Sequence, residues 1–130
     1  MIVLDTHVWL WWLSNPEKLS KSAAKRIEGE TSDGRICISS ISVWETAMLV
    51  AKNRLELSID LNDWLTISES LPFVEFIPVS NRIALQSVHL QELHNDPADR
   101  IIVATAIELS APVVSADSKI IAYPFVKTIW

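Results

Sequence analysis

Cysteine, glycine and long apolar runs are scarce in this sequence, and each shortage excludes a class of protein. Cys37 is the single cysteine among 130 residues, so neither an internal disulfide nor a thiolate metal cage can form. Two glycines, Gly29 and Gly34, are too few for a glycine-rich phosphate loop. No apolar run approaches the ~18 residues that a membrane span needs. The first residues place an acid inside an apolar run without a leading positive charge, which is unlike a signal peptide. A reducing cytoplasm is the simplest setting.

Positive charge is also in short supply. Eleven Lys and Arg residues face sixteen Asp and Glu residues, giving a formal net charge of −5. Proteins that hold nucleic acid through general electrostatics are usually basic, so this charge counts against such a ligand. Two divalent cations bound by acidic residues would offset most of the excess. The basic residues gather in two segments, which we interpret as solvated helix faces, with a phosphate path as the alternative: Lys18, Lys21, Lys25 and Arg26, then Lys52 and Arg54.

Strand-like and helix-like runs alternate along a chain whose length suits one domain, residues 1–130, with one core. Strands are expected at Ile2–Leu4, Ile36–Ser39, Val74–Val79, Val113–Ser115 and Phe125–Ile129. Helices are expected at Thr6–Leu13, Ser20–Glu30, Ser42–Lys52, Asn62–Leu71, Ser80–Leu93 and from Asp96-Pro97 to Leu109. Such alternation is typical of an α/β fold with a mostly parallel sheet.

Four acidic residues stand where strand-like runs end or helix-like runs begin: Asp5, Glu45, Asp99 and Asp117. Singly, each is well explained as a helix N-cap, which is worth about 1 kcal/mol. Ser42 with Glu45, and Asp96 with Asp99, even have the spacing of capping boxes. The carboxyl ends of parallel strands share one edge, however, and ligands bind there.

If the four acids meet at that edge, they repel one another. A like-charged pair at ~4 Å costs about 4 kcal/mol at an effective dielectric of ~20, which exceeds the benefit of a cap. Such a cluster needs a bound cation, or a proton on one acid. Oxygen ligands favour a hard ion, so we expect the four acids to hold one or two Mg²⁺ or Mn²⁺ ions.

Linked motifs covering essentially the whole chain resemble a known family. They are DTHVWLWW from Asp5, SSISVWE ending at Glu45, HNDPADRIIVATA from His94 and VSADSKI from Val114. Their order and spacing resemble PIN-domain ribonucleases of the VapC type, the toxin half of type II toxin–antitoxin pairs. One departure is Asn53, where related sequences often have glycine, but Asn tolerates the same left-handed turn.

The resemblance implies a three-layer α/β/α sandwich with a parallel sheet and Mg²⁺- or Mn²⁺-dependent cleavage of RNA. Asp5, Glu45 and Asp99 fall on the family's three most regular acidic positions, and Asp117 on a fourth that varies more. A cognate antitoxin and a homodimer are the implied protein partners. In this chemistry a metal-activated water attacks phosphorus in line with the leaving oxygen, and no protein nucleophile is needed.

Several neighbours are candidates for supporting the acids or contacting substrate: Thr6, Ser42, Asp96, Arg100 and Ser115. Arg100 is expected to orient an acid, to touch a phosphate or to form a structural salt bridge. His7 and His94 stand near the acids, although a surface or hydrogen-bonded role is favoured over metal ligation. Cys37 is expected in the core.

Six tryptophans are many for this length, and three of them share one short helix, so they cannot all face the core. Trp9 and Trp44 are assigned to the core. Interfaces are enriched in tryptophan. We therefore expect a groove for an antitoxin helix, or a self-association surface, formed by Trp11, Trp12, Met48 and Trp64.

Other classes of protein fit less well. A haloacid-dehalogenase-type phosphatase needs a second Asp two residues after the first, where His7 stands. A receiver domain needs paired acids after the first strand and a Lys after the last strand, and neither is evident. A catalytically silent PIN-like module that binds protein or RNA is opposed by the complete acid set. A structure-specific DNA nuclease generally carries additional DNA-gripping segments. Side-by-side cleavage of RNA and DNA would separate these alternatives.

Overall fold

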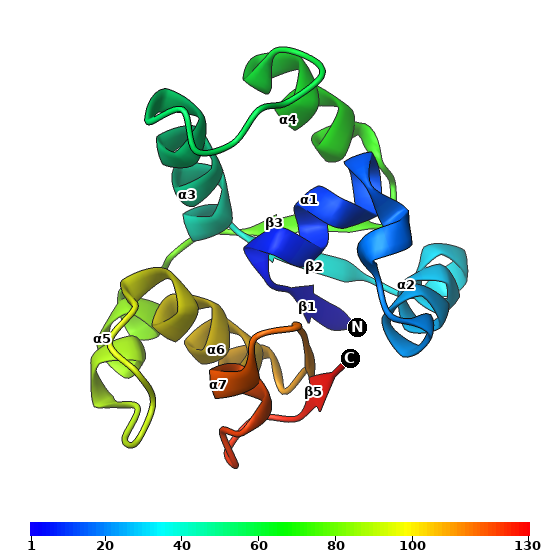
Figure 1. Ribbon diagram of the computed structural model, residues 1–130. Coiled ribbons are helices and arrows are strands. Elements are labelled where there is room, and N and C mark those ends of the chain that lie inside the picture. The colour runs from blue at the N-terminus through cyan, green and yellow to red at the C-terminus, as the bar shows by residue number, and fades with distance from the viewer.

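A five-stranded sheet with β1 (Ile2–Leu4) at its centre organises the computed structural model, which describes residues 1–130 (Figure 1). The other strands are β2 (Ile36–Ser39), β3 (Val74–Ile77), β4 (Val113–Val114) and β5 (Thr128–Ile129). Their order is β3-β2-β1-β4-β5, and every pairing is parallel. Leu4 lies level with Ile38 and Val114, so the residues that follow these strands share one edge of the sheet.

Helices cover both faces of the sheet because the strands are apolar on both sides. The helices are α1 (Thr6–Ser14), α2 (Lys21–Asp33), α3 (Ser40–Ala51), α4 (Leu61–Ser70), α5 (Asn81–His89), α6 (Pro97–Leu109) and α7 (Ser118–Ile121), with a 3₁₀ turn at Pro16–Lys18. Ile2 and Leu4 pack with α1, α2 and α4 on one face, whereas Val3 packs with α5 and α6 on the other. The three-layer α/β/α sandwich is therefore confirmed. No helix has the combination of length and apolar character that crossing a membrane requires.

Several elements end elsewhere than the sequence predicts. Helix α2 continues through Gly29 to Asp33, because the burial of Ile27 and Glu30 outweighs the roughly 1 kcal/mol that an interior glycine costs. Helix α5 stops at His89, short of the predicted Leu93. Strand β3 stops before Pro78, which has no N–H to donate to the sheet. The short helix α7 was not predicted. Asn53, after α3, takes the expected left-handed conformation with φ 56°.

The predicted capping box of Ser42 and Glu45 is wrong. Helix α3 begins two residues earlier, and its cap is Ser39, whose hydroxyl accepts from the backbone N–H of Ile41 at 3.2 Å. Glu45 therefore lies in the second turn of α3, and its carboxylate is not used as a cap. By contrast, Asp96 caps α6 as predicted, accepting from the backbone N–H of Asp99.

Two tryptophans assigned to the core have opposite outcomes. Trp9 is fully buried and packs edge-on against Phe76, and Cys37 is buried as expected. Trp44 is 54% exposed, so its assignment to the core is wrong. The fully buried positions of α3 are Ser42 and Thr46, because this helix presents small polar side chains inward and leaves Trp44 on its outer side.

Candidate active site

One cavity of about 330 Å³ is lined by all four predicted acids, Asp5, Glu45, Asp99 and Asp117, together with His7, Trp11, Asp96 and Ala116. The acids come from the end of β1, from α3, from α6 and from the turn after β4. The chain runs from β1 outward to β2 and β3, then returns to the other side of β1 as β4. Such a reversal of strand order leaves a crevice at the carboxyl ends of the strands, where ligands bind in open α/β sheets.

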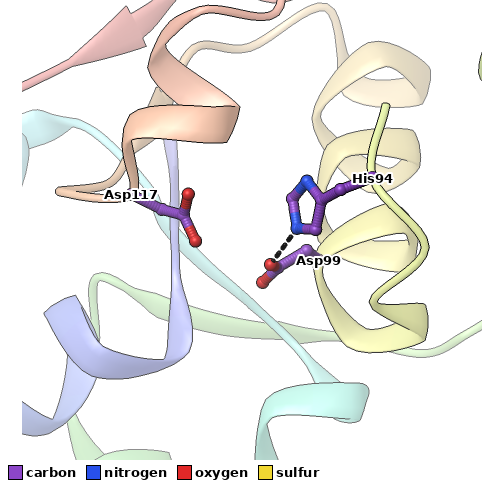
Figure 2. Close-up of side chains that lie close together, drawn as sticks. All are labelled: His94, Asp99 and Asp117. Atoms are coloured by element: carbon purple, nitrogen blue, oxygen red, sulfur yellow. Dashed lines mark hydrogen bonds and ion pairs between the residues drawn. The ribbon is translucent and has the colours of Figure 1, made fainter. Parts of the chain in front are cut away.

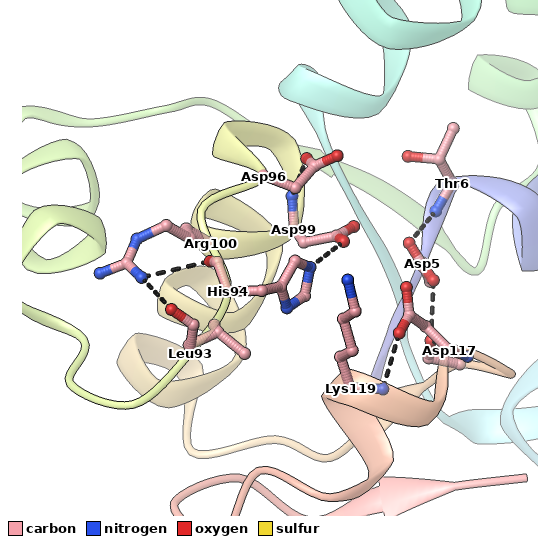
Figure 3. A network of polar contacts seen from close by, with 10 residues as sticks. Asp5, Thr6, Leu93, His94, Asp96, Asp99, Arg100, Asp117 and Lys119 are labelled. Carbon is pink, nitrogen blue, oxygen red and sulfur yellow. Dashed lines mark hydrogen bonds and ion pairs between the residues drawn. The ribbon is translucent and has the colours of Figure 1, made fainter.

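Asp5 is the most buried of the four acids. One carboxylate oxygen accepts from the backbone N–H of Thr6 at 2.8 Å, and the other accepts from the hydroxyl of Ser115 at 2.7 Å (Figure 3). Burial nevertheless raises the pKa of Asp5 above its usual range, and those two hydrogen bonds oppose the rise. These two donors orient the carboxylate, but they do not supply a positive charge that would offset the cost of its burial.

Glu45 faces the same cavity from α3. Burial raises its pKa, the hydroxyl of Thr6 lowers it, and the charges of Asp5 and Asp96 raise it again. The hydroxyl oxygens of Thr6 and Ser42 are 2.8 Å apart and buried. Since either hydroxyl can donate, Ser42 can donate to Thr6 and leave the proton of Thr6 for Glu45. Thr6 and Ser42, both predicted to support the acids, thus link α1 to α3 behind the carboxylates.

Asp99 is paired with a histidine. Its Oδ2 lies 2.6 Å from Nε2 of His94, which precedes the turn into α6 (Figure 2). Burial raises the pKa of Asp99 to about 6, the His94 hydrogen bond lowers it, and the charges of Asp5, Asp96 and Asp117 raise it. Nδ1 of His94 is buried without a hydrogen-bond partner.

His94, Asp99 and Asp117 each offer one ligand atom to a common point, with these atoms within 4.8 Å of one another. Asp117 also caps α7 by accepting from the backbone N–H of Lys119 at 2.8 Å. The donor set suits a cation, because three carboxyl groups in this cavity have raised pKa values and a positive ion would relieve their repulsion. Most of the possible ligand atoms are carboxylate oxygens, which are the ligands that hard ions prefer.

Arg100 does not contact the acids or the cavity. Its guanidinium donates to the backbone carbonyls of Ser87, Val88, Leu90, Leu93 and His94. Figure 3 shows it pointing away from Asp99. The prediction that Arg100 orients an acid or touches a phosphate is therefore wrong, and no salt bridge to it is present either. Instead it holds the loop that carries His94.

The predicted partner groove is not formed. Trp64 is only 6% exposed and packs against Trp9, Trp12 packs on Phe73, and Trp11 lines the acidic cavity instead. An apolar pocket of about 410 Å³ lies elsewhere, between α3 and α4, lined by Ser40, Val43, Trp44, Ala47, Leu65, Glu69 and Phe76.

Sequence reasoning missed two contributors to the surroundings of the acids. The side chain of Lys119 reaches the space between Asp99 and Asp117 (Figure 3), and the three share a second hollow beside the first. Lys119 follows Asp117 by two residues, but its direction depends on helix α7, which was not predicted. The second contributor is Trp11, which forms an aromatic wall with His7, itself expected near the acids; their ring centroids lie 6.0 Å apart.

The parallel sheet and its acidic crevice define a PIN-domain protein, and the family model for the PIN domain matches residues 2–126. Ribonuclease VapC22 of Mycobacterium tuberculosis (strain H37Rv) is 32% identical over 132 residues, covering 99% of this chain and 98% of that protein. The chain belongs to the PIN-domain family, among the nucleases of the VapC type. The resemblance found in the sequence is thereby confirmed.

Solved structures agree on the fold. VapBC2 from Rickettsia felis, bound to a promoter DNA fragment, superposes with a TM-score of 0.71 at 21% identity, covering 98% of this chain and 97% of that one. The DNA-bound VapBC from Salmonella typhimurium has a TM-score of 0.69 at 20% identity, covering 98% and 95%. FitAcB from Neisseria gonorrhoeae gives 0.65 at 21%, covering 98% and 96%.

Proposed function

We propose that residues 1–130 form one PIN domain that acts as a metal-dependent endoribonuclease, the toxin of a toxin–antitoxin pair. The observation that carries the proposal is the meeting of Asp5, Glu45, Asp99 and Asp117 in one cavity at the strand-order reversal. The substrate is RNA, and the reaction is hydrolysis of a phosphodiester bond. A cytoplasmic location follows from that substrate.

The four acids would hold one or two Mg²⁺ or Mn²⁺ ions, with His94 as an additional ligand or as the partner of Asp99. When bound, such an ion polarises the scissile phosphate and lowers the pKa of a coordinated water. The raised pKa values of Asp5, Glu45 and Asp99 support this assignment, because uncompensated carboxylates are crowded here.

The residues behind the acids fix their geometry. Ser115 and the Thr6 N–H orient Asp5, and Thr6 with Ser42 supports Glu45. The Ser115 hydroxyl also accepts from the backbone N–H of Asp117, which ties β4 to the same carboxylate. Ser42 and Ser115 are fully buried within these bonds, so neither is available as a nucleophile. Lys119 is placed to neutralise a substrate phosphate beside Asp117.

The protein partner we propose is the cognate antitoxin. The solved structures named above include toxin–antitoxin complexes of the same fold. The apolar pocket between α3 and α4 supports this partner, because its lining residue Trp44 is 54% exposed and an amphipathic antitoxin helix would cover it. For a homodimer, the supporting feature is α5, which exposes Leu85 and Val88 to solvent.

The decisive experiment compares cleavage of single-stranded RNA and DNA by the purified chain with Mg²⁺ or Mn²⁺, and repeats it with Asp5→Asn and Asp99→Asn. RNA cleavage that needs the metal and disappears in both variants supports the proposal. Equal cutting by wild type and variants would reveal a contaminant. Metal binding without cleavage of any RNA would favour the silent binding module, and preferential cutting of DNA would favour the DNA nuclease.

A further inference from the structure

Trp11 occupies an unusual place for a tryptophan, because it is half-buried on the wall of a cavity otherwise dominated by acids. Its helix neighbours behave differently: Trp9 points into the core, and Trp12 packs on Phe73. Trp11 instead meets the exposed His7 one turn earlier, with ring centroids 6.0 Å apart and planes inclined by 49°. These contacts make an aromatic surface at the rim of the site.

The surroundings of Trp11 fix the ring while leaving it at the surface. Trp130 supports it with ring centroids 5.8 Å apart. The ammonium of Lys18 lies 5.9 Å from its centroid, on an exposed side chain. A lysine stem can swing aside, so a flat ligand can replace the ammonium over the ring while the charge remains close by.

We propose that Trp11, flanked by His7, is a stacking platform for a nucleobase next to the scissile phosphate of single-stranded RNA. The inference rests on the proposed ribonuclease function and adds how that substrate is gripped. Bases of unpaired RNA stack on aromatic side chains, whereas bases inside a duplex are already stacked on one another. The platform therefore selects single strands, loops and bulges over continuous duplex.

Charge explains why such a platform is needed. The chain carries a net charge of −5, and the cavity holds five acidic side chains. General attraction to the phosphate backbone is therefore weak, and affinity must come from contacts that do not depend on net charge. Stacking is such a contact, and it tolerates any base because every base has a π-face. Lys18 lies beside the platform, and Lys119 shares a hollow with Asp99 and Asp117, so each offers a cation to a phosphate that flanks the stacked base.

The test measures RNA binding in an Asp99→Asn background, in which cleavage is expected to be absent. The probe is a fluorescein-labelled pool of random 12-nucleotide single-stranded RNA with Mg²⁺, followed by anisotropy. Trp11→Ala is expected to weaken binding roughly 5- to 150-fold, the range for loss of one base stack. Trp11→Phe, which keeps an aromatic face, should stay within a few-fold of the background protein. Phe125→Ala is the matched control, because Phe125 is an exposed aromatic outside the cavity.

A second arm does not depend on the folding of any Trp11 variant. The background protein should bind an abasic 12-mer, which keeps the phosphates but lacks the bases, more weakly than the random pool by a similar factor. Equal binding of the two RNAs would overturn the platform, as would Trp11→Ala binding like its background or no detectable binding by the background protein. Failure of the wild type to cleave would instead count against the ribonuclease function while leaving the binding result intact.

Discussion

His94 Nε2 and Asp99 Oδ2 lie 2.6 Å apart at the edge of the acidic cavity. The pair joins the loop after α5 to the first turn of α6, and both side chains are largely buried. Its electrostatics differ from those of an ordinary surface ion pair, because the pKa of Asp99 is raised to about 6 despite the histidine. Burial and three neighbouring acids outweigh the one favourable contact.

Without metal, the charge on Asp99 should therefore destabilise the fold increasingly as the pH rises from about 4 to about 6. The folded-state pKa lies above the usual 3.8, so the penalty is absent below about pH 4 and complete above about pH 6. Asp99→Asn should raise the free energy of unfolding by at most about 3 kcal/mol at pH 7.5 in EDTA, with little gain near pH 4. Urea denaturation at both pH values measures this. The exposed Asp33→Asn is the control, and an equal gain for it would contradict the account.

Bound metal should remove this charge penalty and stabilise the folded protein. The carboxylates are crowded only in the folded state, so Mg²⁺ or Mn²⁺ should bind the native protein and raise its Tm. At a metal concentration of one hundred times the Kd, the gain in the free energy of unfolding should be about 2.7 kcal/mol. Asp99→Asn and Asp5→Asn should lose most of this gain, and EDTA should abolish it in the wild type. Differential scanning fluorimetry over a metal titration provides the measurement. An unchanged Tm in the wild type at saturating metal would argue against a metal centre.

Arg100 should prove to be structural, with consequences for activity. Its guanidinium donates to five backbone carbonyls between Ser87 and His94. Lysine cannot reproduce this fork, so Arg100→Lys should lose roughly 2–4 kcal/mol of stability. Below its Tm, the variant should also cleave RNA more slowly because the loop holding His94 loosens. Arg82→Lys is the control, since the exposed Arg82–Glu108 pair should contribute less than about 1 kcal/mol.

The positions of several acids in the cavity can be predicted from the sequence. Asp5 and Asp117 follow buried strands, so a parallel sheet brings them to one edge, and this much follows from the hydrophobic pattern. The Asp-Pro pair at the start of α6 indicates the positions of Asp96 and Asp99.

Other residues depend on packing that the pattern does not contain. The direction of Arg100 depends on the loop into which α5 unwinds, and the exposure of Trp44 depends on α3 burying Ser42 and Thr46 instead of an aromatic stripe. The average burial of tryptophan favours a core position for Trp44, but this tendency does not say which face of α3 turns inward. Of the two small polar residues of α3 that face inward, Ser42 bonds to Thr6 of α1, a long-range relationship absent from the local sequence.

The α3/α4 pocket should be required for the antitoxin and dispensable for catalysis. Trp44 is a large exposed side chain on that pocket, so Trp44→Ala should weaken antitoxin binding by about 2 kcal/mol or more, the effect expected of a hot-spot tryptophan. RNA cleavage by the free toxin should be unchanged, because Trp44 does not line the acidic cavity. Calorimetry and the cleavage assay test both parts. Phe125→Ala should alter neither, and unchanged antitoxin affinity in Trp44→Ala would place the partner elsewhere.

The two glycines of the chain should respond oppositely to alanine. A Cβ on Gly29, inside α2, would meet nothing within 4 Å, so Gly29→Ala should stabilise the protein by about 0.5–1 kcal/mol through helix propensity.

A Cβ on Gly34 would overlap the carboxylate of Glu30 and lie 2.9 Å from its Cα. That carboxylate accepts from Arg26, from the backbone N–H of Arg35 and from the amino group of Met1, so it cannot move without losing these bonds. Gly34→Ala should therefore destabilise by roughly 1–3 kcal/mol. Thermal unfolding of both variants checks the pair, and a Gly34→Ala protein as stable as wild type would show that Glu30 can relax after all.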